Sequence, residues 1–295
     1  MSSGPERMTT KLRRMMDAPG LIRAVNVYDP LTARIAQSMG FKAIALGGFQ
    51  LGATLCVTEP TLTMTETIEH GQLIARSVTI PLKVDCGAGF GDPVHVTRTI
   101  REAENAGIAC IHIEDQLFPK RAHYHRGIEH VIPAEEMVEK IKAAVQARRD
   151  PDFVLVGRTD AMRTDDVHEG IRRGNMYLEA GCDMIEVFPN TVEEAALAAR
   201  EIKGPVLYVN SSGNRLGRPV IPWRQLEEMG YRMVLDATTV LIAAAHGVRH
   251  ALEHYVRDGR PPQDLADNVE MREWIETIIG LPEYYAIEEQ TTERR

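Results

Sequence analysis

Short apolar segments alternate with longer amphipathic ones along most of the chain. The short segments are rich in Val, Ile and Leu without strict alternation, which is typical of parallel strands buried on both faces. Eight of them are predicted as strands: residues 21–27, 42–46, 81–85, 109–114, 153–158, 183–188, 205–210 and 232–236. Between them, apolar residues recur at helical spacing, and a glycine ends most of these stretches, as expected of helix C-caps.

Eight strands, each followed by a helix, in a chain of 295 residues predict an α/β fold, the (β/α)8 TIM barrel. An open doubly wound sheet is the alternative, but it usually carries a glycine-rich phosphate turn after its first strand. The sequence at that point, NVYDPL, contains no glycine. We therefore predict a catalytic barrel over residues 1–260.

The remaining residues, 261–295, are not needed for the eight strand–helix units. They contain two segments, NVEMREWIETIIG and LPEYYAIEEQ, that read as amphipathic helices. Such helices could cap the barrel or pack on a partner subunit. We expect the second, so that residues 261–295 form a C-terminal helical extension in a homo-oligomer.

Charge and cysteine content narrow the class of protein. Lys and Arg number 34 against 42 Asp and Glu, a net charge of −8, which argues against nucleic acid or a membrane surface as a partner. No apolar run approaches the roughly 18–20 residues that span a bilayer, and the N-terminus lacks the apolar segment of a secretory signal. The four cysteines form no CxxC pair, so we expect free thiols and a cytoplasmic enzyme acting on a small molecule.

Polar residues stand where the predicted strands end, which is where barrel enzymes place their active sites. Asp85 and Glu114 end adjacent strands, and carboxylate oxygens are the ligands that Mg²⁺ prefers, with Mn²⁺ as a substitute. Arg158 ends the next strand and could grip a carboxylate through two hydrogen bonds. Gly47 and Gly48 could offer backbone N–H groups to an anion. Together these residues predict a site for a small carboxylate substrate bound through a divalent metal.

Two features of the strand ends have simpler interpretations. Asp29 and Asp160 follow strands and could merely cap the next helix. The segment 118–130, FPKRAHYHRGIEH, is polar and rich in His, so it could be a lid over the site or only a solvated surface loop. If it is a lid, His123, Tyr124 and His125 are the candidates for moving protons.

Three motifs now identify a family. The motifs DCGAGFGDP (85–93), HIEDQLFPKR (112–121) and VGRTDAM (156–162) occur in the order and spacing of the isocitrate lyase / phosphoenolpyruvate mutase superfamily, which the chain resembles over roughly residues 12–260. The resemblance implies a Mg²⁺-containing (β/α)8 barrel in a dimer of dimers that exchanges its C-terminal helix between subunits. Members include 2-methylisocitrate lyase, 2,3-dimethylmalate lyase, oxaloacetate hydrolase and decarboxylase, and phosphonopyruvate enzymes.

The resemblance also implies roles for individual residues. By position, Asp85 and Glu114 match the metal-site carboxylates, Arg158 the carboxylate-binding arginine, and Gly47 and Gly48 the backbone cradle. Glu186 and Asn210 match positions that contact the substrate. Lys120 matches a catalytic loop residue, and Glu59 matches another through a looser alignment.

Two departures from the family pattern put the reaction in question. The second Asp of the usual Asp-x-Asp is Gly87, and the loop Cys that serves lyases as acid or base is Ala122. We expect a Mg-dependent carbon–carbon lyase that acts on a 2-hydroxy or 2-oxo di- or tricarboxylate through a metal-held enolate and releases pyruvate or a similar 2-oxo acid. The alternatives are an oxaloacetate-type decarboxylase, a catalytically impaired barrel that serves as a scaffold, and phosphonate chemistry.

Overall fold

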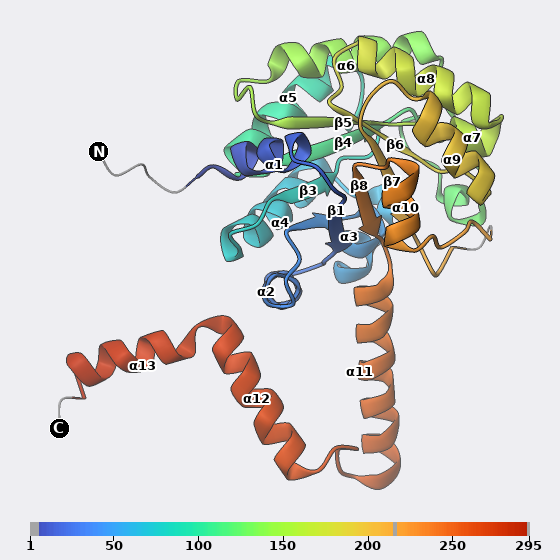
Figure 1. Ribbon diagram of the computed structural model, residues 1–295. Coiled ribbons are helices and arrows are strands. Elements are labelled where there is room, and N and C mark those ends of the chain that lie inside the picture. The colour runs from blue at the N-terminus through green and yellow to red at the C-terminus, as the bar shows by residue number, and fades with distance from the viewer. Residues whose placement is uncertain (1–5, 215–216, 294–295) are drawn as a thin grey trace.

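The eight predicted strands form one closed parallel barrel, so the predicted fold is confirmed. The structure, a computed structural model, describes residues 6–214 and 217–293. The barrel closes between the first and last strands, where Ala24 pairs with Leu235 (Figure 1). The strands are β1 Ile22–Asn26, β2 Ala43–Leu46, β3 Leu82–Asp85, β4 Cys110–Glu114, β5 Val154–Arg158, β6 Met184–Val187, β7 Val206–Asn210 and β8 Met233–Asp236.

Helices follow the strands and cover the outside of the barrel. Several begin at the polar caps that the sequence indicated: Asp29 accepts a hydrogen bond from the Thr32 N–H, and Asp92 caps the helix after β3. The helices are α2 Pro30–Ser38, α3 Gly48–Thr54, α4 Met64–Ser77, α5 Pro93–Asn105, α6 Ala134–Ala147, α7 Ala161–Thr164, α8 Val167–Glu179, α9 Val192–Glu201 and α10 Trp223–Met229, with 3₁₀ turns at Glu59–Thr61 and Ala122–Arg126.

An additional N-terminal helix, α1 (Met8–Asp17), packs on the end of the barrel where the strands begin. Its Leu12 and Met16 are buried in one cluster with interior side chains such as Met184 and Met233. This apolar plug leaves the opposite end, where the strands terminate, as the open mouth of the barrel.

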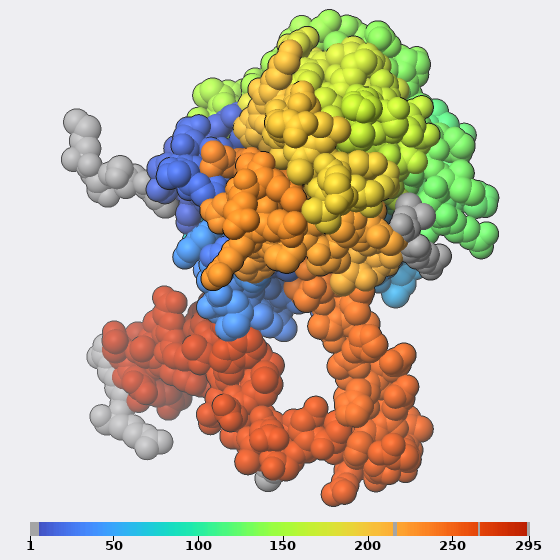
Figure 2. Space-filling model, turned by 45° about the vertical axis from the view of Figure 1, so that its right-hand side comes forward, coloured from blue at the N-terminus to red at the C-terminus, as the bar shows by residue number. Residues whose placement is uncertain are grey.

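A C-terminal arm of three helices projects away from the barrel (Figures 1 and 2). The arm comprises α11 (Thr239–Asp258), α12 (Leu265–Ile279) and α13 (Leu281–Gln290). None of the residues of α11 is buried. The arm returns to the barrel through α12, where the Arg34 guanidinium donates to the Ile278 carbonyl at 3.1 Å. Among the described residues, no helix is long and apolar enough to cross a membrane.

Candidate active site

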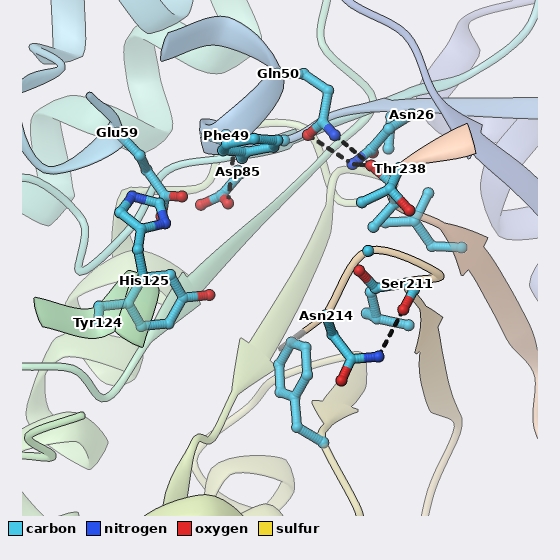
Figure 3. A pocket seen from close by; sticks show the side chains of 18 of the residues that line it. Asn26, Phe49, Gln50, Glu59, Asp85, Tyr124, His125, Ser211, Asn214 and Thr238 are labelled. Atoms are coloured by element: carbon cyan, nitrogen blue, oxygen red, sulfur yellow. Dashed lines mark hydrogen bonds between the residues drawn. The ribbon is translucent and has the colours of Figure 1, made fainter. Parts of the chain in front are cut away.

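A cavity of about 460 Å³ opens at the mouth of the barrel (Figure 3). Most of the residues predicted for the site line it: Gly47, Gly48, Glu59, Asp85, Tyr124, His125, Arg158 and Glu186. A smaller adjoining cavity shares Glu59 and Asp85 with the first and is also lined by Lys120. Glu114 is fully buried next to Lys120 and Arg158. His123 is exposed and lies outside both linings, and so does the buried Asn210.

A chain of charged side chains runs through the barrel interior below the cavity. His112 Nε2 lies 2.8 Å from an Asp85 oxygen, and its Nδ1 faces the Lys83 amine and Glu186. Lys83 Nζ is 2.7 Å from Glu186 Oε2. All of these side chains are almost completely buried, so the ion pairs operate in a low dielectric and interact strongly.

The pairing sets the ionisation of these groups. Burial alone would raise the pKa of Asp85, but the charge and hydrogen bond of His112 hold it well below its usual range. Burial would lower the pKa of His112, yet Asp85 and Glu186 raise it overall. Burial would raise the pKa of Glu186, but the charges of His112 and Lys83 lower it. The two carboxylates are therefore ionised at neutral pH.

Glu114 lies between two cations. Its oxygens are 2.9 Å from Lys120 Nζ and 3.0 Å from Arg158 Nη1. Lys120 also pairs with Glu59, so it links the loop after β4 to the 3₁₀ turn after β2. Burial would lower the pKa of Lys120, but Glu114 and Glu59 raise it well above its ordinary value, which keeps the amine charged.

Arg158 is held on several sides at once. Besides Glu114, its guanidinium lies 3.1 Å from Asp160 and donates to the Tyr124 hydroxyl at 3.0 Å. Asp160 therefore pairs with Arg158, and its side chain makes no helix cap. Burial would lower the pKa of Arg158, but Asp160 and Glu114 raise it well above its ordinary value. Such a fixed, charged fork suits recognition of a carboxylate.

The donor set around Asp85 fits a divalent cation. Ligand atoms of Asp85, His112 and Glu114 all lie within 4.8 Å of one another. Both Glu114 oxygens are buried and face only the cations of Lys120 and Arg158, so Glu114 lies directly behind the cavity lining. The two carboxylates suit Mg²⁺ or Mn²⁺, while His112 is paired with Asp85 through Nε2 and with Glu186 through Nδ1. Gly87 contributes only its backbone N–H, which donates to Asp85 at 2.8 Å.

The two predicted cradle glycines lie where backbone and side chains approach closely. The Gly48 N–H donates to the second Asp85 oxygen at 3.1 Å, so it orients this carboxylate. A Cβ at Gly47 would come within 2.7 Å of the Asn26 amide nitrogen, and one at Gly48 within 2.6 Å of Glu59. Glycine is therefore required here for α3 to begin beside the site.

The loop after β4 lies over the cavity. Tyr124 and His125 line it, and His125 Nε2 is 3.5 Å from the Thr58 hydroxyl (Figure 3). Burial raises the pKa of Tyr124. Ala122, at the position of the lyase cysteine, begins a 3₁₀ turn and is exposed.

Several side chains at the site were not predicted from the sequence. Lys83 and His112 are interior residues of β3 and β4, Arg163 lies in the short helix α7 after β5, and Arg218 lies in the loop after β7. A charged residue in the middle of an otherwise apolar strand was the available signal for Lys83 and His112, because such a residue is costly to bury without a role. Asn210 was predicted as a substrate contact. Its side chain instead bonds the backbone N–H and carbonyl of Ile221, both at 2.9 Å.

Known proteins share this architecture and much of this sequence. The family model described as phosphoenolpyruvate phosphomutase matches residues 12–256. A 2-methylisocitrate lyase of Aeropyrum pernix is 34% identical over 284 residues, covering 95% of this chain and 89% of that protein.

Solved structures agree with these matches. A crystal structure of 2,3-dimethylmalate lyase, described as a member of the PEP mutase/isocitrate lyase superfamily, has a TM-score of 0.87 at 29% identity and covers 97% of this chain and 95% of its own. A phosphonopyruvate hydrolase in complex with oxalate and Mg²⁺ has a TM-score of 0.86 at 28% identity, covering 97% of this chain and all of its own (100%).

Proposed function

This chain belongs to the phosphoenolpyruvate mutase family, and from that membership we propose that it cleaves a carbon–carbon bond in a small carboxylate. The substrate class is a 2-hydroxy or 2-oxo di- or tricarboxylate, and the product is pyruvate or a similar 2-oxo acid. The named relatives that match most of its length include lyases for 2-methylisocitrate and 2,3-dimethylmalate. The observation that carries the proposal is that Asp85, His112 and Arg158 line one cavity, with Glu114 buried directly against Arg158.

Arg158 is assigned to bind the substrate carboxylate next to the reacting carbon. Its position is fixed by Glu114, Asp160 and Tyr124, so little side-chain entropy is lost when the substrate binds. Asp85 and Glu114 would hold Mg²⁺ or Mn²⁺, with His112 orienting Asp85, and the metal would supply positive charge to stabilise an enolate oxygen.

Proton transfer is assigned to the loop after β4. Cleavage next to a 2-hydroxyl group turns that carbon into a carbonyl and leaves a carbanion on its former neighbour. One proton must leave the hydroxyl, and one must reach the carbanion. Tyr124, whose pKa is raised by burial, is assigned as the donor, and His125 as the acceptor, because both line the cavity. His123 is exposed and receives no role.

Ala122 favours one second candidate, an oxaloacetate-type decarboxylase. Alanine carries no titratable proton, and loss of CO₂ needs a carboxylate clamp and enolate stabilisation without the loop acid of the lyases. The two reactions differ in their products. A decarboxylase releases CO₂ and one organic acid, whereas a lyase releases two organic products.

The direct test is product analysis. The protein is incubated with Mg²⁺ or Mn²⁺ and a panel of 2-hydroxy and 2-oxo di- and tricarboxylates, and products are identified by mass spectrometry alongside a CO₂ assay. Two organic products, one of them a 2-oxo acid, support the lyase. Oxalate binding is measured in parallel by calorimetry, because oxalate imitates the enolate of pyruvate. No turnover and no oxalate binding with either metal would refute the proposal.

Arg158→Ala tests the residue assignment. We expect kcat/KM to fall by roughly 100- to 1,000-fold, because a charged, preorganised contact to the reacting end is lost. Arg101→Ala, which removes an exposed arginine of α5, is the matched control and should leave kcat/KM unchanged. Near-wild-type kinetics of Arg158→Ala would remove this residue from the mechanism.

We also propose that the protein is a homo-oligomer, a dimer of dimers packed through its C-terminal arm. Val248, Leu252 and Val256 of α11 are each more than half exposed, at 59%, 59% and 86%. They line an apolar groove with Tyr28 and Ala53 of the barrel. Exposed apolar surface of this kind favours association. Light scattering should give the mass of a tetramer, and Leu252→Glu should lower it; a monomeric wild type would refute this assignment.

A cytoplasmic location is proposed from the cysteines. All four are free, and three of them (Cys86, Cys110 and Cys182) are buried, as expected in a reducing compartment. Cell fractionation tests this location, and recovery of the protein in a secreted fraction would contradict it.

A further inference from the structure

Arg218 is a buried guanidinium without a carboxylate partner. It lies on the loop between β7 and α10, lines the cavity and is only 7% exposed. Its Nη1 donates to the Val209 carbonyl at 3.4 Å, and its guanidinium carbon lies 4.8 Å from the centre of the Phe188 ring. Over the described part of the chain, no Asp or Glu lies within ion-pair distance of it.

The other two arginines of the cavity are neutralised. Arg158 pairs with Glu114 and Asp160, and Arg163 pairs with Glu129. All three guanidinium groups approach Phe188, at 4.5, 5.7 and 4.8 Å from its ring centre. Burial lowers the pKa of Arg218, and the charge of Arg163 lowers it further. A buried cation in this position is costly unless an anion joins it.

The loop that carries Arg218 is braced at both of its described ends. Asn214 donates to the carbonyls of Ser211 at 2.6 Å and Arg218 at 3.2 Å, and it accepts from the Arg218 N–H at 2.9 Å. Asn210 ties the strand end to Ile221. These bonds hold the backbone of Arg218 in place before any ligand arrives, which lowers the entropic cost of binding.

This loop faces the predicted metal-binding residues across the cavity. Ser211 and Asn214 lie on the side opposite Asp85 and Glu59 (Figure 3). A ligand whose 2-oxo or 2-hydroxy acid end sits by Asp85 and Arg158 therefore extends toward the β7–α10 loop. There the ligand reaches the guanidinium of Arg218, whose positive charge is not neutralised by the described residues.

We propose that Arg218, with Arg163 beside it, forms a second anion subsite that binds the distal carboxylate of the substrate. This inference rests on the proposed function and assigns a residue to the second carboxylate of its substrate class. The substrate carries a carboxylate at each end, and Arg218 is the specificity residue that rejects monocarboxylates. A monocarboxylate leaves the guanidinium buried and unpaired, whereas a dicarboxylate neutralises it with charge-assisted hydrogen bonds.

The test compares a short ligand with a longer one in the Mg²⁺-loaded protein. Oxalate joins its two carboxylates directly, whereas malate places two carbons between them and so extends further from the Arg158 end; the affinity of each ligand is measured by calorimetry. Arg218→Gln should weaken malate about 30-fold, equivalent to about 2 kcal/mol, and oxalate by less than about threefold. Arg218→Lys should recover part of the malate affinity. Arg224→Gln, which removes an exposed arginine of α10, should change neither ligand.

A stability measurement separates this role from a purely structural one. Without ligand, Arg218→Gln should melt at the same temperature as the wild type or higher, because a costly buried charge is removed. A lower melting temperature, with malate and oxalate weakened equally, would overturn the proposal. So would an unchanged malate affinity in Arg218→Gln.

Two further outcomes distinguish the carboxylate subsite from a phosphonate subsite and from the proposed function. If 3-phosphonopyruvate binds more tightly than malate and Arg218→Gln removes that advantage, the subsite takes a phosphonate and the carboxylate assignment is overturned. If wild-type protein neither turns over any acid of the panel nor binds oxalate with either metal, the proposed function fails. Binding of malate that still depends on Arg218 would then support the subsite alone.

Discussion

Glu114 and Asp115 are neighbours in the sequence and equally buried, yet they differ in every contact. Both have no exposed surface. Glu114 faces Lys120 and Arg158 at ion-pair distance, and neither of its oxygens accepts a hydrogen bond from the described residues. Asp115 accepts bonds from the Thr159 hydroxyl at 2.7 Å and the Asp160 N–H at 3.0 Å. It accepts two more, from Arg173 at 3.1 Å and Tyr177 at 2.8 Å.

The comparison shows that burial of a carboxylate does not by itself mark a functional residue. The lone pairs of Asp115 are used by the protein, so this side chain is a structural tie between the barrel and α8. Glu114 is paired instead with Lys120 and Arg158, two cations that line the cavities at the mouth of the barrel. The partners of a buried carboxylate, and not its charge or depth, separate the group that holds the fold together from the group that belongs to the site.

Removal of Asp115 should have the largest effect on stability. Asp115→Ala leaves the Tyr177 and Thr159 hydroxyls without their acceptor in a buried site, and Arg173 keeps only Glu169 and the Ile132 carbonyl. We expect the free energy of unfolding to fall by about 3–5 kcal/mol, measured by urea denaturation. A variant that unfolds with the wild-type midpoint would show that Asp115 is not the structural member of the pair.

Glu114→Gln should give the opposite pattern, with a loss of binding and little change in stability. The amide keeps the shape but loses the charge, and we expect Mg²⁺-dependent oxalate affinity to fall about 100-fold or more. The free energy of unfolding without metal should change by less than about 1 kcal/mol, because Arg158 keeps Asp160 and Lys120 keeps Glu59 as partners. Unchanged oxalate affinity would remove Glu114 from the metal site.

The same contrast explains what the sequence could and could not reveal. The strands were predictable because their apolar runs are continuous, and each predicted range contains the observed strand. Asp85 and Glu114 were noticed because they end such runs. Lys83 and His112 were not predictable as site residues because positions inside a strand read as core, and nothing in the local pattern shows that the two meet across β3 and β4.

The positions of the loops and of the C-terminal arm could not be predicted from the hydrophobic pattern, for a different reason. The position of Arg218 depends on side-chain bonds of Asn210 and Asn214 to their own loop, which have no periodic signature. The helical pattern of α12 and α13 was recognisable. The direction of α11, which carries its apolar residues away from the barrel, was not predictable. Amphipathic spacing shows that a helix has an apolar face but does not identify the surface that covers this face.

The smallest predicted effect concerns how the stability of the side-chain cluster around Asp115 falls in acid. Glu169 bonds Arg172 and Arg173, and Arg173 in turn bonds Asp115. The hydrogen bonds of the two arginines lower the pKa of Glu169 to about 2, from an ordinary value of 4.5. Because the folded-state pKa is the lower one, this stabilisation is complete above the unfolded-state value and is lost as the pH falls from about 4.5 to about 2.

Glu169→Gln should therefore cost more stability near neutral pH than in acid. We expect a loss of about 1 kcal/mol or less at about pH 6, since the side chain is 25% exposed, and a smaller loss at about pH 3. Glu139→Gln, which removes an exposed carboxylate paired with Lys142, controls for the loss of one charge. Equal pH profiles for the two variants would show that Glu169 does not support the cluster. The structural role of Asp115 would then rest on its own four hydrogen bonds, without support from Glu169.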